Sequence, residues 1–142
     1  MTRIKSITLA IGAISILLVV FLSAVSVGQV KRPGFSAKPM MVGEISGVNE
    51  KQIAIINVSI QPGASSPLHT HPGDCYGAVL KGNVELFVEG KTSRLFSAGE
   101  AWHNPRGPVH YFKNVGDTPV QLVNTLVVDK GKKRTQIHKV QK

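Results

Sequence analysis

From about residue 30 onward, apolar and polar residues alternate over short stretches that turn residues separate. The stretch 53–60 (IAIINVSI) is rich in β-branched side chains, and Gln61-Pro62-Gly63 ends it. Similar stretches recur at 68–71, 75–80, 84–88, 92–96, 101–103, 110–113 and 120–128. No part of this region shows the period of an amphipathic helix. About eight short strands at this spacing predict an all-β sandwich or barrel.

The first thirty residues follow a different pattern. Arg3 and Lys5 precede an uncharged run at 7–28, in which 16 of 22 positions are apolar. The order of basic, apolar and small residues is typical of a secretory signal, and the run is also long enough for one membrane span. We therefore predict an exported protein in which residues 1–28 are a signal peptide or an anchor helix. A cleaved signal implies a periplasmic or secreted protein, and an uncleaved one implies membrane contact through 7–28.

Length and composition limit the remainder to one ordinary domain. The chain has 142 residues, and 42% of them are hydrophobic against 18% charged, which excludes a fully disordered protein. A single cysteine excludes an internal disulfide. We divide the mature chain into a polar, Pro-containing lead-in at 29–52, a β-barrel at 53–128 and a basic tail at 129–142.

The positive charge is concentrated in the tail. The chain carries 17 Lys and Arg against 8 Asp and Glu, and six of the basic residues lie at 129–142. Such a tail suits an anionic surface, but no aromatic residues are interleaved with the charges to stack on bases. We therefore expect a solvated, mobile terminus and no nucleic-acid partner.

The histidines carry the candidate chemistry. His69 and His71 are two residues apart, so on a strand their side chains share one face. His110 opens another predicted strand, which a shared sheet would bring alongside the pair. Imidazole is a good ligand for Zn, Cu, Fe and Ni. Taken alone, however, a His-x-His pair is more often two surface histidines than a metal site.

Two longer patterns surround these histidines. The first, from Gly63 to Gly82, reads G-x5-H-x-H-x3-C-x6-G, and the second, from Gly99 to Asn114, reads G-x5-P-x-G-x2-H-x3-N. They resemble the two signature motifs of the cupin superfamily. Nine of ten fixed positions agree, and the departure is Cys75, where the family usually has Glu.

The resemblance covers roughly 53–128 and implies a small single-domain cupin of the type-2 conserved-barrel kind. Its fold would be a double-stranded β-helix, or jelly-roll barrel, around one metal ion. Carried over by position, His69, His71 and His110 would hold a divalent ion, namely Fe, Cu, Zn, Ni or Mn.

Cys75 has three interpretations. It lines the pocket while three histidines bind the metal, or its thiolate is a fourth ligand, which would favour Zn or Cu(I). In the third, no metal binds and Cys75 is a small buried apolar group. Thiol dioxygenases of the cupin class also have a Cys here, sometimes cross-linked to a tyrosine. Tyr76 and Tyr111 each follow an inward position, so they should point away from the pocket and form no such cross-link.

Two classes of function follow. One is an exported metal-dependent oxidoreductase, such as an Fe or Cu dioxygenase, in which three neutral ligands leave room for a small-molecule substrate and O2. His103 is its candidate acid or base, although a surface or packing role is commoner for such a residue. The other is a non-catalytic periplasmic module that binds or senses a metal or small ligand. In either class a homodimer is expected, because many cupins pair through their sheets.

Trp102 and Phe112 should form core or pocket wall.

Overall fold

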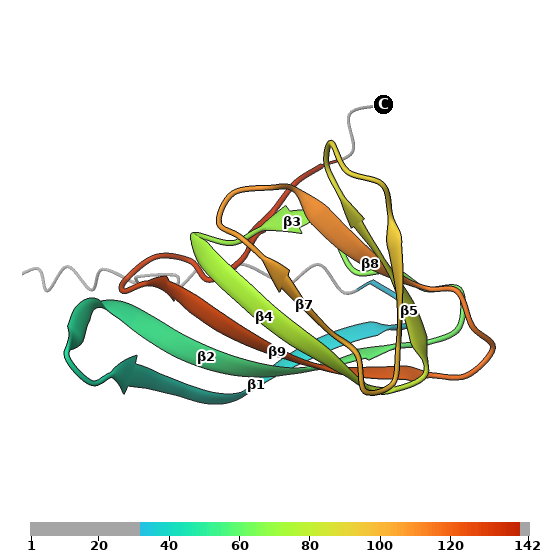
Figure 1. Ribbon diagram of the computed structural model, residues 1–142, viewed down its shortest axis with the longest axis horizontal. Coiled ribbons are helices and arrows are strands. Elements are labelled where there is room, and N and C mark those ends of the chain that lie inside the picture. Colours follow the sequence, from blue (N-terminus) through green and yellow to red (C-terminus); the bar gives the residue numbers. More distant parts are fainter. Residues whose placement is uncertain (1–31, 140–142) are drawn as a thin grey trace, which may run out of the picture.

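The computed structural model describes residues 32–139, which form two antiparallel β-sheets in a jelly-roll arrangement (Figure 1). Every regular element in this range is a strand, which confirms the all-β prediction. Residues 1–31 and 140–142 lie outside the described range, so the predicted signal or anchor at 1–28 does as well. Among the described residues, no helix has the length and apolar character needed to span a membrane.

Each sheet has five strands, and strands far apart in sequence are neighbours in both. The first sheet has the order β1 (Phe35–Ile45), β2 (Val48–Ile60), β9 (Val120–Asp129), β4 (Gly73–Lys81) and β7 (Ala101–Asn104). The second has the order β10 (Gln136–Ile137), β3 (His69–Thr70), β8 (His110–Asn114), β5 (Asn83–Val88) and β6 (Arg94–Ser97). In Figure 1 the β1–β2–β9 layer lies below, and β3, β8 and β5 lie above it.

Alternation of apolar and polar residues builds the core between the sheets. In β9 every second residue from Val120 to Val128 is buried, as expected of a strand with one face turned inward. The main cluster draws on both sheets and consists of Val58, Ile60, Val79, Val84, Leu86, Phe96, Trp102, Phe112, Val120 and Leu122. The core positions predicted for Trp102 and Phe112 are confirmed, with 7% and 1% of these residues exposed.

A second, smaller cluster occupies another part of the interior. It contains Ala54, Cys75, Leu126 and Val128, all from the first sheet, and Ile56 packs against both clusters. Ile56 and Leu126 from this part of the interior line a pocket together with His71. The interior therefore changes from an apolar core to a polar pocket along the length of the barrel.

The strand β1 was not expected from the sequence, which suggested only a polar lead-in. It pairs with β2 from Phe35, opposite Ile60, to Ile45, opposite Val48. It forms an edge of its sheet, and its register shifts after Pro39. Most of its residues are exposed, so burial imposes little alternation on them.

Gly73 sets the distance between β4 and β9 at the point where the chain leaves His71. A Cβ at Gly73 would lie 2.0 Å from the carbonyl oxygen of Val127 and 2.6 Å from the Cα of Val128. Both obstacles are backbone atoms, so no side-chain rotation relieves the contact. The β4–β9 pairing that begins at Gly73 therefore depends on the missing side chain.

We expect Gly73→Ala to lower the free energy of unfolding by about 1–3 kcal/mol, because β9 must move away from β4. Gly43→Ala is the matched control, since its Cβ would find only the Cγ2 of Ile53 at 3.8 Å and its φ is not positive. Urea unfolding of both variants measures the difference. Equal stabilities would contradict the close-packing argument.

Candidate metal centre

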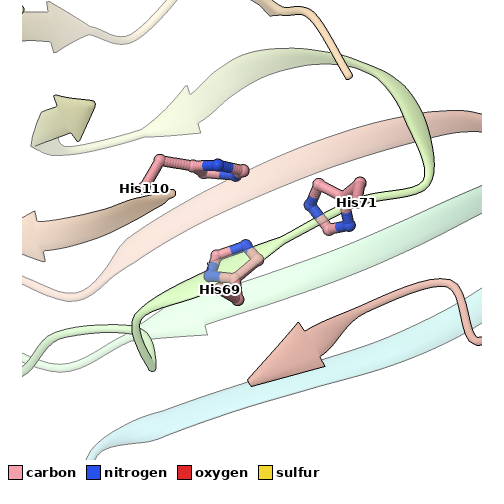
Figure 2. Close-up of side chains that lie close together, drawn as sticks. All are labelled: His69, His71 and His110. Atoms are coloured by element: carbon pink, nitrogen blue, oxygen red, sulfur yellow. The ribbon is translucent and has the colours of Figure 1, made fainter. Parts of the chain in front are cut away.

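Three histidines from two paired strands converge inside the barrel. His69 begins β3 and is the register partner of His110, which begins β8, and His71 follows β3. Ring centroids are 4.3 Å apart for His69 and His110, 4.9 Å for His69 and His71, and 5.2 Å for His71 and His110. Figure 2 shows the three rings around one shared space. The predicted approach of His110 to the pair is confirmed.

The hydrogen bonds of the three rings leave the same nitrogen free on each. Nδ1 of His69 lies 2.7 Å from the Pro67 carbonyl oxygen, and Nδ1 of His110 lies 3.0 Å from that of Pro108. Nδ1 of His71 lies 2.7 Å from the carbonyl oxygen of Arg134. A carbonyl oxygen only accepts, so each Nδ1 carries the proton and each Nε2 presents its lone pair.

Burial keeps these rings neutral. Desolvation, with smaller contributions from the other two ring systems, lowers the pKa of His69 to about 3. Desolvation likewise lowers the pKa of His71 to about 4, and it lowers the pKa of His110. Neutral imidazole is the form that binds a metal ion.

Comparison with known proteins agrees with this geometry. The model of the cupin domain family matches residues 56–129. The chain belongs to the cupin family. A germin-like protein, subfamily T member 2, from Arabidopsis thaliana is 33% identical over 97 residues, which cover 65% of this chain and 44% of the relative. Oxalate oxidase GF-3.8 from Triticum aestivum is 32% identical over 105 residues, which cover 68% and 47%. This cupin thus spans about half the length of these curated relatives.

Solved structures show the same fold. An oxalate oxidase in complex with the substrate analogue glycolate superposes with a TM-score of 0.60 at 22% identity, and the match covers 78% of this chain and 58% of the oxidase chain. A DMSP lyase from Ruegeria pomeroyi superposes with a TM-score of 0.58 at 21% identity, covering 72% and 51%. The predicted cupin jelly roll is confirmed.

The donor set of this cupin fits a divalent transition-metal ion. The possible ligand atoms of His69, His71 and His110 all lie within 4.8 Å of one another. Nε2 of His71 and Nε2 of His110 are buried and have no protein partner. A buried nitrogen lone pair without a partner is costly, and a bound ion would satisfy both. Three neutral imidazoles suit Zn, Cu, Fe or Ni and leave other coordination positions to a ligand.

Cys75 lies on the opposite sheet, in the small apolar cluster. It is fully buried and packs with Ala54, Leu126 and Val128. Its sulfur is not among the clustered ligand atoms, which belong to the three histidines. Burial raises the pKa of the thiol to about 12, so the thiol is protonated in the metal-free protein.

His103 is on the outer face of β7, away from the three histidines. Its neighbours Trp102 and Asn104 are buried, whereas the His103 side chain is 48% exposed. The ring stacks on Tyr76 at 4.6 Å, and its Nε2 lies 3.6 Å from Oδ1 of Asp74. The structure therefore does not bring this candidate acid or base to the site. Tyr76 is likewise exposed, as expected.

The basic tail returns to the site. We call residues 130–138 the C-terminal strap. Its strand β10 pairs with β3, with Ile137 opposite His69, and the N–H of His138 donates to the Leu68 carbonyl at 2.8 Å. Most of the strap is exposed, as expected of a solvated terminus, but its docking on β3 was not predicted. The reason is that the strap docks through backbone groups, which no side-chain pattern signals.

A pocket of about 420 Å³ opens beside His71. One wall is largely apolar and comes from the first sheet, and the other comes from the strap. The lining residues are Ala37, Pro39, Ile56, His71, Asn124, Leu126, Lys132, Lys133, Arg134 and Thr135. The strap thus brings three basic residues to the pocket that His71 lines.

The depressed histidine pKa values predict how the stability of the metal-free protein depends on pH. Histidines in the unfolded chain take up protons below about pH 6.5. In the folded protein, His71 takes up a proton only near pH 4 and His69 only near pH 3. The unfolded state therefore binds more protons in this window, and stability is lost as pH falls from about 6.5 to 4. The loss should be about 1 kcal/mol per pH unit for each histidine.

Urea unfolding in the presence of a chelator measures this slope. Subtracting the His69→Gln curve from that of the parent isolates one histidine and cancels the titrating carboxylates. Above pH 7.5 the difference should be flat. A difference that stays flat or shrinks as pH rises from about 4 to 6.5 would contradict the assignment of a neutral, buried His69 ring.

Proposed function

We propose that this cupin is an exported, metal-dependent oxidoreductase that binds one divalent ion through His69, His71 and His110 and acts on a small anionic molecule. The observation that carries the proposal is the convergence of three buried imidazoles whose Nε2 atoms are free for a metal. A bound ion would supply a Lewis acid or redox centre. Export rests on the residue pattern of 1–28, and the homodimer stays a prediction.

The charge of the pocket supports an anionic substrate. Lys132, Lys133 and Arg134 line it, and among its described lining residues none is acidic. Because the pocket is open to solvent on one side and apolar on the other, its positive field attracts a carboxylate and orients it toward His71. Asn124 and Thr135 add polar side chains for hydrogen bonds. The related oxalate oxidase was solved with glycolate, which is also a small carboxylate.

The chain's own residues have defined tasks in this proposal. The three histidines hold the ion, the strap binds the anion, and Leu126 and Ile56 exclude water from one wall. Cys75 lines the interior as a protonated thiol and takes no part in ligation.

One observation favours the second candidate, a non-catalytic module that binds or senses a metal and a small anion. Among the described pocket-lining residues there is no Asp, Glu, Tyr or Cys to transfer a proton, and His103 lies on the outer face of the barrel. Turnover would then depend on the metal-bound ligands and on the amino groups of Lys132 and Lys133. Product analysis of the metal-loaded protein with small carboxylates under air distinguishes catalysis from binding.

Metal content tests the site itself. We expect about one ion per chain in the parent and in Cys75→Ala, and almost none in His69→Ala, because two imidazoles do not retain a divalent ion through purification. His103→Ala is the matched control, since it removes a histidine from the outer face. Elemental analysis of untagged protein gives the result. Metal that survives in His69→Ala, or that disappears in Cys75→Ala, would contradict the three-histidine site.

A second experiment tests whether the pocket binds an anionic ligand through its lysines. Lys132→Gln/Lys133→Gln should raise the Kd of the metal-loaded protein for glycolate by about 10-fold or more, because two charge-assisted contacts are lost. Lys81→Gln/Lys113→Gln removes the same charge from exposed positions elsewhere and should have little effect. Titration calorimetry with glycolate and with its neutral amide measures both. Equal affinity for the two compounds in the parent would overturn the anionic assignment.

A further inference from the structure

The three metal-ligand candidates differ in where their hydrogen-bond acceptors come from. His69 and His110 each use the carbonyl of a proline two residues earlier, in Pro67-Leu68-His69 and Pro108-Val109-His110. The Pro-x-His sequence therefore orients these two rings locally. His71 instead uses the carbonyl oxygen of Arg134, which is 63 residues away in the C-terminal strap.

The chain is anchored to the barrel both before and after the Arg134 carbonyl. Before it, Asp129 is bound by Lys51 at 2.6 Å and by the Arg106 guanidinium at 2.6 and 2.8 Å. The N–H of Lys130 also donates to the carbonyl of Glu50 at 2.9 Å. These contacts fix the point at which the strap leaves β9.

After the Arg134 carbonyl, the strap is fixed to β3. Gln136 and Ile137 pair with Thr70 and His69. His138 adds its backbone bond to Leu68, and its Nε2 lies 3.1 Å from Oγ1 of Thr70. In Figure 1 the red chain after β9 turns back and rises past β3.

The acceptor for His71 decides which nitrogen of that ring is available. With the Arg134 carbonyl in place, Nδ1 is protonated and Nε2 is free. Without it, the remaining neighbour is Oγ1 of Thr135 at 3.4 Å, which belongs to the same strap. A ring with neither partner is free to rotate and to carry its proton on Nε2, where the proton blocks ligation.

We infer that the C-terminal strap is the positioning element of the metal site: the Arg134 carbonyl, held by docking of the strap on β3, sets the tautomer and orientation of His71. The chain after β9 is therefore part of the metal centre. The metal-binding consequence rests on the proposed function, whereas the tautomer of His71 does not.

Two variants release the strap from β3. A chain that ends at Lys133 lacks the Arg134 carbonyl. His138→Pro keeps Arg134 and its carbonyl in the chain. It removes the backbone N–H that His138 donates to the Leu68 carbonyl and the imidazole ring that contacts Thr70. Lys139→Pro is the matched control, because it introduces a proline just beyond the docked residues. Lys81→Gln/Lys113→Gln is the second control, because it removes two charges from exposed positions outside the strap and the pocket.

The first readout needs no metal. Nitrogen-15 NMR of the imidazoles in the metal-free full chain should show His71 as the Nδ1–H tautomer. His138→Pro and the shortened chain should shift His71 toward Nε2–H, while His69 and His110, with local acceptors, keep their tautomer. An unchanged His71 tautomer in a folded His138→Pro variant would overturn the inference. Circular dichroism confirms folding, and if the shortened chain unfolds, His138→Pro decides alone.

The second readout is metal affinity in competition with a chelator. The Kd for Zn²⁺ should rise by about 10- to 100-fold in both strap variants and stay within the error of the parent in both controls. With Cu²⁺ as probe, pulsed electron paramagnetic resonance should count three coordinated imidazoles in the parent and two in the strap variants. Equal loss in Lys139→Pro, or no loss in His138→Pro, would contradict the strap's role. If the parent binds neither ion, the proposed function fails, and the NMR result still decides the positioning role.

Discussion

Burying three imidazole rings side by side imposes the constraint on which the site depends. Each ring has to be neutral, because an apolar interior penalises the charged form and the neighbouring rings add repulsion. Each ring N–H also needs an acceptor, because an unpaired buried donor costs free energy. Once carbonyl oxygens accept from Nδ1, the three Nε2 atoms are left facing one another. The convergence of the three Nε2 atoms therefore follows from the hydrogen bonds that the three Nδ1–H groups donate to backbone carbonyls.

The barrel supplies those acceptors through backbone pairing. The β3–β8 register places His69 opposite His110, and the prolines before them present their carbonyls without further help. His71 lies where the chain turns from β3 into β4, and there Gly73 lets β4 approach β9 closely. That contact brings the end of β9, and with it the strap, within reach of His71. The close packing of β4 on β9 at Gly73 thus helps to place the Arg134 carbonyl that accepts from His71.

The resemblance of the two motifs to those of cupins was sufficient to predict that His69, His71 and His110 come together inside the barrel. The strands from Ile53 to Val128 were predictable because burial of one face imposes alternation. Two features gave no such signal. The strand β1 is exposed and lies at an edge, and the strap joins the site through carbonyl and N–H groups that every residue carries. Its lysines and arginine suggested a solvated tail, although Gln136, Ile137 and His138 of the same segment dock on β3.

Cys75 shows how a single departure from the family pattern changes the electrostatics. Where a cupin has Glu, a carboxylate can offset part of the charge of a divalent ion. Here the thiol is buried in an apolar cluster and protonated, so three neutral imidazoles would leave the full charge of the ion uncompensated. The strap adds Lys132, Lys133 and Arg134 at the same pocket. A positive charge beside an apolar wall raises the free energy of the site, because it is only partly solvated. A bound anion would offset this desolvation cost. Under the proposed function, the missing carboxylate at Cys75 and the basic residues of the strap would therefore act in the same direction, and both would favour a bound small anion.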